Sequence, residues 1–422
     1  MTNATKVTKF EDLPENWQCK SLKEVVSLMR GFSYGSSQIT RDFPTSVRII
    51  NINDFDKVSG WKVTPEFLYL LDTNIPIKFK LQQSELLIAN TDMSKGIIIG
   101  APLHIDKIPE RTTYIFSSDL TRLSPLSDQL NTKFLFYFLN HEPIRKIARS
   151  YAQGTNVLHL NHDLFKETSI LIPPLLEQQK IAEILSITDD IIQNINEQIS
   201  QGKKLKKDLM QTLFTKGVGH TKFKMTEIGE MPEEWILKNL GDNEISLIKM
   251  GQSPPSGTYN KAGDGLPFLQ GNAEFGVKHP SFTIYCSLPL KITQPGDILI
   301  SVRAPVGDVN IANSKYCIGR GLATIRSNPR SMDGLFLYYT LNHFKLLLER
   351  ISTGSTFKAI GKEQLHSLKI PLPKIVEQQK IAEILTTVDR KIELLNEKKK
   401  EAEKLKRGLM DKLLTGKVRV KV

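Results

Sequence analysis

Two histidines three positions apart are the strongest candidates for metal chemistry in this sequence. His159 and His162 belong to the segment HLNHD, and imidazole is a common zinc ligand. A metal site needs further ligands, and none accompanies this pair at a suitable spacing. We therefore expect HLNHD to cap a helix or to lie on the surface. The three cysteines are too far apart for a CxxC zinc site or a disulfide framework, at Cys19, Cys286 and Cys317.

Two further segments approach catalytic motifs without matching them. GSTFKAIGKE (354–363) has the wrong glycine spacing for a phosphate-binding loop and no hydroxyl residue after its lysine. IPPL (172–175) lacks both the amide and the aromatic residue of the [ND]-P-P-[YF] motif of adenine methyltransferases. We therefore expect no catalytic residue in this chain, no metal site and no cofactor bound by it.

Loops rich in glycine and polar side chains carry the residue types that contact DNA. Base edges are read by Arg, Lys, Asn, Gln, Ser and Thr, whereas phosphates are bound by cations, hydroxyls and backbone N–H groups. An ordinary turn is the alternative for each such loop, and both tyrosines among them could equally be packing residues. The candidate DNA-binding residues are Arg30, Ser33, Tyr34, Ser36, Ser37, Gln38, Asn90, Thr91, Lys95, Gln252, Ser253, Ser256, Tyr259, Asn260, Lys261, Gln270, Asn272, Arg303 and Arg320.

The charge balance is compatible with a nucleic-acid partner. Lysine and arginine total 57 against 45 acidic residues, giving a net charge of +12 and a pI near 9.3. Such a balance favours a polyanionic partner, although other classes of protein share it. The run Lys398-Lys399-Lys400 is more typical of a solvated helix face. No segment is a signal peptide or approaches the ~20 apolar residues of a membrane span, so we expect a soluble, cytoplasmic protein.

An internal duplication organises the chain. The nonamer EQQKIAEIL occurs at 177–185 and again at 377–385, 200 positions later. Earlier landmarks also repeat, since PENW (14–17) has a counterpart in PEEW (232–235). Between these landmarks the halves differ widely. Similar ends around dissimilar middles indicate one scaffold used twice to present two different surfaces.

The repeated segments have the pattern of long helices. Apolar residues step by four and three positions, which is a heptad seam, and the seam shifts phase near Gly202 and Ala402. Prolines precede each segment and glycines follow it. Neither helix is stable alone, so each needs an apolar partner, and the second can pack along the first only by running antiparallel to it. An unrelated dimerisation coil is the alternative. The first seam is Ile181, Leu185, Thr188, Ile192, Ile195 and Ile199, and the second is Ile381, Leu385, Val388, Ile392 and Leu395.

These patterns predict four segments. Each half opens with a mixed α/β domain, because strand-like runs such as DILISV stand beside helix-like stretches. The expected fold is thus two α/β (α+β) domains separated by two long helices that form an antiparallel coiled coil, with an internal pseudo-two-fold repeat. The segments are a first recognition domain at 1–172, a first helix at 173–217, a second recognition domain at 218–372 and a second helix at 373–422.

An approximate two-fold axis relating two basic modules is typical of a dimeric DNA reader. Dimers of that kind place their reading elements about one helical turn, ~34 to 36 Å, or a multiple apart on the duplex. Here both readers are on one chain and differ in sequence. The expected target is therefore two unequal half-sites separated by unread bases, with the helices setting the gap.

The whole chain resembles the specificity (S) subunit of type I restriction–modification systems. That family alternates two variable target-recognition domains with two repeated helical regions, in the order found here. The first recognition domain matches less closely, through MRGFSYGSSQ (29–38), SELLIANTDMSKGIIIG (84–100) and YAQGTNVLHL (151–160). The strongest matches are the two P-E-x-W starts, the two helices, GQSPPSGTYNKAGDGLPFLQGNAEFG (251–276), PGDILISVRAPVGDVNIA (295–312) and STGSTFKAI (352–360).

The resemblance implies a non-catalytic subunit that recognises double-stranded DNA. It implies two modification subunits, which are S-adenosylmethionine-dependent adenine methyltransferases, and restriction subunits that use ATP and Mg²⁺ to translocate and cut DNA. The helical repeats would dock the modification subunits, so the expected partner-binding residues are Glu177, Gln178, Gln179, Ile181, Glu377, Gln378, Gln379 and Ile381.

Other classes of function remain open at this stage. A specificity chain of a bipartite type IIB-like system would differ only in its partner. A coiled-coil adaptor with incidental basic charge would give no sequence-specific retardation of duplex DNA. A standalone nuclease or methyltransferase is the weakest alternative, because the sequence has no carboxylate cluster and no cofactor loop.

Overall fold

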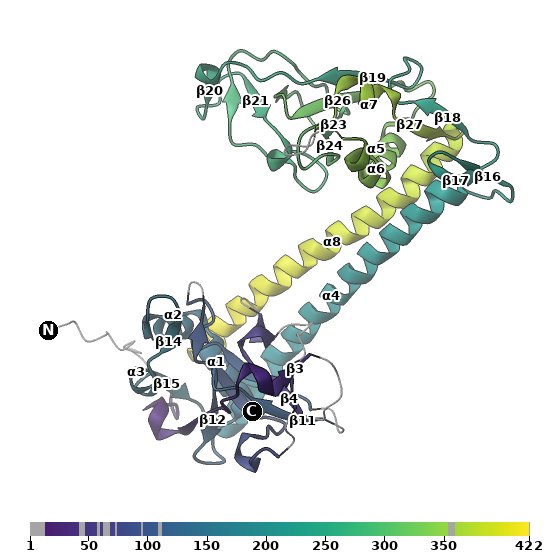
Figure 1. The fold of residues 1–422 in the computed structure, drawn as a ribbon. Helices are drawn as coiled ribbons and strands as arrows, with labels where there is room; N and C mark the ends of the chain where they lie inside the picture. Colours follow the sequence, from purple (N-terminus) through teal and green to yellow (C-terminus); the bar gives the residue numbers. More distant parts are fainter. Residues whose placement is uncertain are drawn as a thin grey trace. The chain divides into compact units, whose positions relative to one another are not determined.

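The chain folds into two compact units that share its two long helices (Figure 1). Unit 1 comprises Met1–Ile195 and Lys398–Val422, and unit 2 comprises Asn196–Glu397. Each unit therefore holds one recognition domain and one half of each long helix. The structure is a computed structural model, and it describes residues 13–41, 47–56, 60–61, 68–71, 74–93, 96–108, 112–352 and 359–421.

The two long helices are α4 (Leu175–Lys216) and α8 (Ile375–Leu413). In unit 2 their contacts run from Glu377 with Val218, through Asp389 with Lys206, to Ile392 against Gly202. Residue numbers therefore increase along α8 in the direction in which they decrease along α4, so the two helices run antiparallel. In unit 1, Asp189 of α4 likewise meets Lys406 of α8. The expected antiparallel pairing is confirmed within each unit.

The recognition domain of unit 1 is built on two four-stranded sheets. The first has the strand order β10-β8-β12-β2 and is antiparallel, and the second has the order β11-β4-β7-β3 with β11 and β4 parallel. The bounds are β2 Val26–Arg30, β3 Ile39–Thr40, β4 Val47–Ile50, β7 Leu68–Leu70, β8 Leu86–Ala89, β10 Pro102–His104, β11 Thr113–Phe116 and β12 Leu120–Pro125.

Unit 2 repeats both sheets with the same connectivity. Its orders, β24-β23-β26-β19 and β25-β21-β22-β20, correspond strand by strand to those of unit 1, including the one parallel pair, β21 with β25. The bounds are β19 Ser246–Met250, β20 Tyr259–Asn260, β21 Leu266–Leu269, β22 Tyr285–Cys286, β23 Ile298–Ser301, β24 Val309–Ile311, β25 Cys317–Ile318 and β26 Leu322–Ser327. The predicted mixed α/β domains are confirmed.

Short helices and small sheets complete the domains. Among these, β1 with β15 in unit 1 corresponds to β18 with β27 in unit 2. The helices are α1 Thr132–Asn140, α2 Glu142–Ser150, α3 His162–Lys166, α5 Gly334–His343, α6 Lys345–Ile351 and α7 Lys362–Ser367. The strands are β1 Gln18–Ser21, β5 Phe55–Asp56, β6 Gly60–Trp61, β9 Thr91–Asp92, β13 Ala152–Gln153, β14 Leu158–Leu160, β15 Ser169–Ile172, β16 Phe223–Thr226, β17 Gly229–Pro232, β18 Ile236–Asn239 and β27 Lys369–Leu372. The 3-10 helices are η1 Leu22–Glu24, η2 Ser36–Gln38, η3 Ile52–Asp54, η4 Ile77–Phe79, η5 Ser256–Thr258 and η6 Asn272–Glu274.

The seams of the long helices form part of each domain's hydrophobic core. In unit 1, Ile181 and Leu185 of α4 are fully buried in the same core as Phe134 of α1, and in unit 2 Ile381 and Leu385 of α8 belong to the corresponding core. Complete burial of such a side chain stabilises the fold by roughly 1.5–3 kcal/mol. Each helix start is therefore fixed to its own domain. None of the helices in the described ranges has an apolar stretch long enough to cross a lipid bilayer.

Candidate nucleic-acid interface

Three loops of unit 2 meet at one turn, Gly319-Arg320-Gly321, between β25 and β26. The loops after β19, β21 and β23 all bond to this turn or to the strand residues beside it. We call the meeting point the loop edge of unit 2, made of Gly251–Ser253, Gln270, Val302–Arg303 and Gly319–Gly321. Its bonds are Gly251 N to Leu322 O (2.9 Å), Gln252 N to Ile318 O (3.1 Å), Gly319 N to Leu269 O (2.8 Å) and Val302 N to Gly321 O (2.9 Å).

Unit 1 has the same edge, closed by the equivalent backbone bonds around the turn Ser117-Ser118-Asp119. The loop edge of unit 1 comprises Arg30–Ser33, Asn51, Asn90–Thr91 and Ser117–Asp119. Its bonds are Gly31 N to Leu120 O (3.0 Å), Phe32 N to Phe116 O (2.8 Å), Ser117 N to Ile50 O (2.9 Å) and Asn90 N to Asp119 O (2.7 Å). One backbone framework therefore presents two different sets of side chains.

Arg320 is the only side chain that the turn of unit 2 presents. A Cβ atom at Gly319 would come 3.1 Å from Gln270 Cα, and one at Gly321 would come 2.5 Å from the Gln270 carbonyl oxygen. The turn therefore packs closely on the loop after β21 and has no room for side chains there. The backbone N–H of Arg320 donates to Ser253 Oγ at 3.1 Å. The Arg320 side chain itself is exposed, as is that of Arg303.

In unit 1 the positions that correspond to Arg303, Arg320 and Gly321 hold Thr91, Ser118 and Asp119, which are neutral or acidic. Thr91 Oγ1 donates to Asp119 Oδ1 at 3.2 Å, while Asn90 Nδ2 donates to the Ser118 carbonyl at 3.3 Å. Arg30 Nε donates to the same carbonyl at 2.8 Å and the residue remains exposed. Asn90 and Thr91 are buried, so the side chains of these two candidates stabilise the turn from inside the domain.

Besides Ser253, which accepts from Arg320 N, three candidate DNA-binding residues of unit 2 have structural partners. Tyr259 stacks on Phe268 with ring centroids 4.6 Å apart, and burial raises its pKa. Asn260 Oδ1 accepts from two backbone N–H groups of its own turn, at 3.1 and 3.0 Å. Asn272 Nδ2 donates to Asp308 at 2.8 Å. Of the remaining candidates, Gln252, Ser256, Lys261, Gln270, Arg303 and Arg320 are exposed, and Ser253 is half-buried.

The candidates of the first domain are likewise of two kinds, those with a structural role and those that are exposed. Gln38 Oε1 accepts from Gly35 N at 2.7 Å, which closes a turn. Tyr34 is half-buried, and burial raises its pKa. The exposed candidates are Arg30, Ser33, Ser36, Ser37 and Gln38. Lys95 lies outside the described residues.

Ser118 and Asp119 of the loop edge were not among the sequence candidates. The segment SSDL reads as an ordinary turn, because no glycine or lysine marks it. Only the pairing of β12 with β2 and with β8 brings this turn beside Arg30 and Asn90. The sequence feature that marks this turn is its position between two apolar runs that are typical of strands.

The HLNHD segment has a structural role, as expected. Asn161 caps α3 by accepting from Asp163 N and Leu164 N at 3.0 and 3.1 Å. His162 Nε2 lies 3.0 Å from Asn90 Oδ1, and burial lowers the His162 pKa, with Arg30 adding to that effect. His162 therefore helps hold Asn90 under the loop edge.

The repeated nonamer fixes each long helix to its own domain. Glu177 Oε2 accepts from Trp17 Nε1 at 3.0 Å, and Arg419 donates to both Glu177 oxygens at 2.6 and 2.8 Å. In unit 2, Glu377 accepts from Trp235 Nε1 at 3.0 Å and lies 3.0 Å from His220 Nε2. The P-E-x-W starts and the helix starts thus form one buried contact in each unit.

The second residue of the nonamer binds the start of a domain helix. Gln178 Oε1 accepts from Asn131 N at 2.8 Å, and Asn131 in turn caps α1. Gln378 accepts from Asp333 N at 2.8 Å, and Asp333 caps α5 in the same way. Both glutamines are fully buried.

These contacts correct part of the prediction of partner-binding residues. The side chains of Glu177, Gln178, Ile181, Glu377, Gln378 and Ile381 are buried or nearly so and are bonded or packed within their own unit. Their burial removes them from any surface that another subunit could contact. Direct contact with a partner stays a prediction for Gln179 and Gln379, which are exposed.

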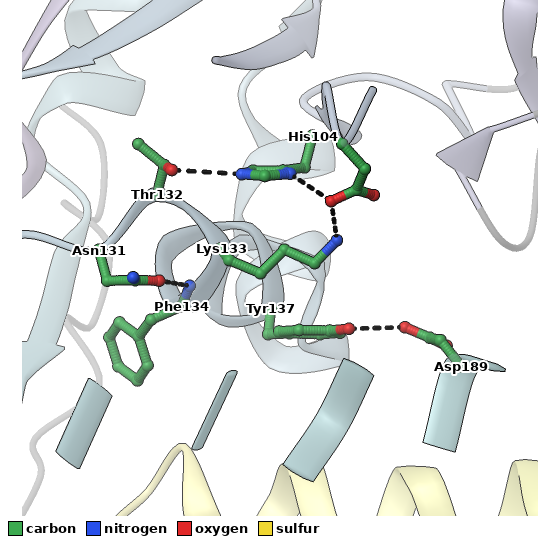
Figure 2. Close-up of polar contacts among 8 residues, drawn as sticks. His104, Asn131, Thr132, Lys133, Phe134, Tyr137 and Asp189 are labelled. Carbon is green, nitrogen blue, oxygen red and sulfur yellow. Dashed lines mark hydrogen bonds and ion pairs between the residues drawn. The ribbon is translucent and has the colours of Figure 1, made fainter. Parts of the chain in front are cut away.

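A polar cluster lies beside α1 in unit 1, near the bond from Tyr137 to Asp189 of α4 (Figure 2). His104 lies between Asp106 and Thr132, with its Nδ1 2.8 Å from Asp106 Oδ1 and its Nε2 3.2 Å from Thr132 Oγ1. Lys133 also bonds Asp106. Burial raises the pKa of Asp106, but the bonds to His104 and Lys133 outweigh this effect and lower that pKa to about 2. The described residues contain no group of three or more potential metal ligands.

The family model for the type I restriction modification DNA specificity domain matches the chain twice, at residues 14–201 and 232–404. The two matches coincide with the two recognition domains and the helix that follows each. The chain belongs to this family, and its architecture is that of a type I restriction–modification specificity subunit with two target-recognition domains and a helical coiled coil.

Individual relatives agree with this assignment. The chain is 40% identical over 419 residues to a putative type I restriction enzyme MjaX specificity subunit of Methanocaldococcus jannaschii, covering 99% of this chain and 97% of the relative. It is 33% identical to the MjaVIII specificity subunit of the same organism, covering 73% and 75% of the two chains.

Solved structures support the fold. A chain from a study of complex assembly and conformational transition of a type I restriction–modification system matches with a TM-score of 0.57 and 28% identity, over 96% of this chain and 100% of that one. The specificity subunit from M. genitalium matches with a TM-score of 0.61 and 17% identity, over 96% and 98% of the two chains, and supports the fold alone.

Proposed function

We propose that the chain recognises an asymmetric, bipartite DNA target, with each recognition domain reading one half-site through its loop edge. The observation that carries this proposal is the identical backbone framework of the two loop edges. Equivalent hydrogen bonds close both turns, while the residues differ, with half-buried Ser118 and Asp119 in unit 1 and exposed Arg320 beside buried Gly321 in unit 2. The same backbone carries different polar side chains in the two units. This arrangement suits two domains that recognise different DNA sequences.

The two long helices would also bind two copies of one modification subunit. Within the nonamer, Gln179, Lys180 and Glu183 are exposed, and their counterparts Gln379, Lys380 and Glu383 are identical and also exposed. The domain contacts described above do not require these identities, because those contacts use Glu177, Gln178 and the apolar positions. Two identical outward faces are expected if the same protein binds at both.

The chain itself would remain non-catalytic and would act in the cytoplasm. Base methylation would belong to the modification subunits, which use S-adenosylmethionine and extrude the target adenine from the duplex. Restriction subunits, which use ATP and Mg²⁺, would complete the endonuclease.

Methylation mapping tests the recognition half of this proposal. Single-molecule sequencing of N6-methyladenine would compare DNA from cells that express this chain with its neighbouring methyltransferase and from cells that express the methyltransferase alone. A split, asymmetric motif that depends on this chain is expected. The absence of a new motif, with both proteins shown to be associated, would contradict it and favour an adaptor role.

Native mass spectrometry of the purified complex tests the docking half. The triple substitution Gln179→Ala, Lys180→Ala and Glu183→Ala should reduce the methyltransferase content from two copies to one. The matched triple at Gln379, Lys380 and Glu383 should do the same, and combining both should leave none. Two copies retained in every variant would exclude these faces as the docking sites.

A further inference from the structure

We infer that the two loop edges read bases of opposite hydrogen-bonding character. In unit 2, Arg320 reads a guanine through its major-groove acceptors. In unit 1, Asp119 reads an exocyclic amino group, that of cytosine or adenine. The inference rests on the proposed function, since it assigns base chemistry to the same two edges.

The equivalence of positions follows from the backbone bonds of the edges. Arg30 pairs with Thr121 across β2 and β12, as Met250 pairs with Ala323 across β19 and β26. Counting back from these pairs, Ser118 corresponds to Arg320 and Asp119 to Gly321. The loops after β8 and β23 are related in the same way, because Asn90 N bonds Asp119 O and Val302 N bonds Gly321 O.

At three equivalent positions the two units therefore differ in charge, while Arg30 of unit 1 stands where unit 2 has Met250. Unit 1 has Thr91, Ser118 and Asp119, whereas unit 2 has Arg303, Arg320 and Gly321. The unit 2 set adds two cations and the unit 1 set adds one anion on the same backbone. Arg303 and Arg320 are exposed and Ser118 and Asp119 are half-buried, so the charge difference at these positions lies at the surface of the shared frame.

Arg320 is suited to guanine for two reasons. A guanidinium has only donors, and its planar fork matches the O6 and N7 acceptors of guanine, which is the commonest specific contact in DNA complexes. The Arg320 side chain is exposed and has no ion-pair or hydrogen-bond partner among the described residues. The Arg320 backbone is held by the hydrogen bond to Ser253 and by the close packing of Gly319 and Gly321. The Cα atom that carries the side chain is therefore fixed in position.

Asp119 offers the complementary chemistry. An ionised carboxylate only accepts, and in the major groove the partners available to it are the amino groups of cytosine N4 and adenine N6. Oδ1 accepts from Thr91, while Oδ2 has no hydrogen-bond partner among the described residues. The half-buried Asp119 therefore has one fixed and one available oxygen. Phosphates would be repelled by this charge, which leaves base edges as its DNA contact.

The test uses the purified complex with its methyltransferase and duplexes that carry the mapped motif. We expect Arg320→Gln to weaken binding to that motif roughly tenfold to a hundredfold, to lose the guanine preference in the half-site read by unit 2 and to leave the base preferences in the half-site read by unit 1 unaffected. Replacing the guanine by 7-deazaguanine, which lacks the N7 acceptor, should weaken wild-type binding but change little further in Arg320→Gln. Arg320→Lys, which keeps the charge without the planar fork, should also lose guanine preference.

Asp119→Asn should change the base preference at one position of the half-site read by unit 1, because the carboxamide replaces one acceptor oxygen by a donor. Loss of affinity on replacing cytosine by 2-pyrimidinone or adenine by purine, each lacking the exocyclic amine, identifies which base is read. The matched controls are Arg330→Gln and Asp128→Asn, exposed residues outside both loop edges, which should leave both half-sites unchanged.

The possible outcomes distinguish failure of the proposed function from failure of the base assignment alone. If the wild-type chain gives no split motif, the proposed function fails. If a split motif is found but Arg320→Gln and Asp119→Asn leave its base preferences unchanged, with the complexes intact, the base assignment alone is overturned.

Discussion

The Lys206 ammonium group of α4 lies 2.7 Å from the Asp389 carboxylate of α8 in unit 2. Tyr339 of the recognition domain donates to the same carboxylate at 2.7 Å. In unit 1 the roles of the helices are exchanged, because Asp189 belongs to α4 and accepts from Lys406 of α8 and from Tyr137 (Figure 2). One carboxylate thus ties both long helices to the domain helix in each unit, and it fixes the antiparallel register.

Removing this carboxylate should destabilise its unit. Asp389→Ala leaves the Tyr339 hydroxyl without its carboxylate partner, and burial together with Asp389 holds the Tyr339 pKa well above its usual value, so the phenol is a donor. Thr386 Oγ1 lies 3.3 Å from the Tyr339 hydroxyl and can accept a longer bond, so we expect a cost of about 1 kcal/mol, at the lower end of that for an unsatisfied donor. Urea unfolding of the variant and wild type measures the difference. A change below a few tenths of a kcal/mol would show that the contact does not hold the helices.

Adjacent glutamines of the nonamer should differ sharply in their effect on stability. Gln378→Ala removes three hydrogen bonds, to Asp333 N, Ser331 O and Pro373 O, and leaves buried backbone groups unpaired, at about 1–3 kcal/mol for each unsatisfied group. Gln379→Ala, at an exposed position, is the matched control and should be nearly neutral. Thermal unfolding by circular dichroism would compare the two, and equal midpoints would contradict the assigned role.

The C-terminal segment should stabilise unit 1 through Arg419. Its guanidinium bonds both oxygens of the buried Glu177 and donates to the Glu15 carbonyl at 3.1 Å, so Arg419→Ala leaves a buried carboxylate without its cation. We expect a lower unfolding midpoint and a changed Trp17 environment, measured by fluorescence. Lys421→Ala, two residues further on and exposed, is the control. Identical behaviour of the two variants would exclude the contact.

Acid should weaken unit 1 through Asp106. Its folded-state pKa of about 2 is below the ordinary value of 3.8, so it contributes stability above the unfolded pKa that is lost as pH falls through the folded one. The stability difference between wild type and Asp106→Asn should therefore be largest above about pH 4 and shrink toward pH 2. Urea midpoints across that range provide the measurement. A difference independent of pH would show that the carboxylate gains nothing from His104 and Lys133.

The sequence predicts the helices and the duplicated plan well, because heptad seams, capping residues and the repeated nonamer are local signals. It also predicts that loops after strands carry the DNA-contacting residue types, and Arg303 and Arg320 do lie exposed at the loop edge. It does not reveal that Asn90 and Thr91 are buried beneath Asp119. Those relationships depend on strand pairing between residues far apart in the chain.

The repeated nonamer is a second case in which the sequence does not reveal contacts between residues far apart in the chain. Its repetition indicates a constrained surface, and a partner subunit was the natural interpretation. The constraint on Glu177 and Gln178 instead comes from Trp17 and Asn131 of the same unit, at separations of 160 and 47 residues. No local pattern distinguishes an internal contact of that kind from an external one.

The measurement that tests the central claim most directly is the methylated motif of a chain with lengthened helices. Four residues inserted after Ile195 in α4 and four after Glu397 in α8, where the two units divide, would lengthen the helix pair by ~6 Å. If two domains read separate half-sites at a spacing set by the helices, both half-sites should persist and the unread gap should grow by about two base pairs, at ~3.4 Å each. Altered half-sites, or the original gap with full methylation, would contradict the account.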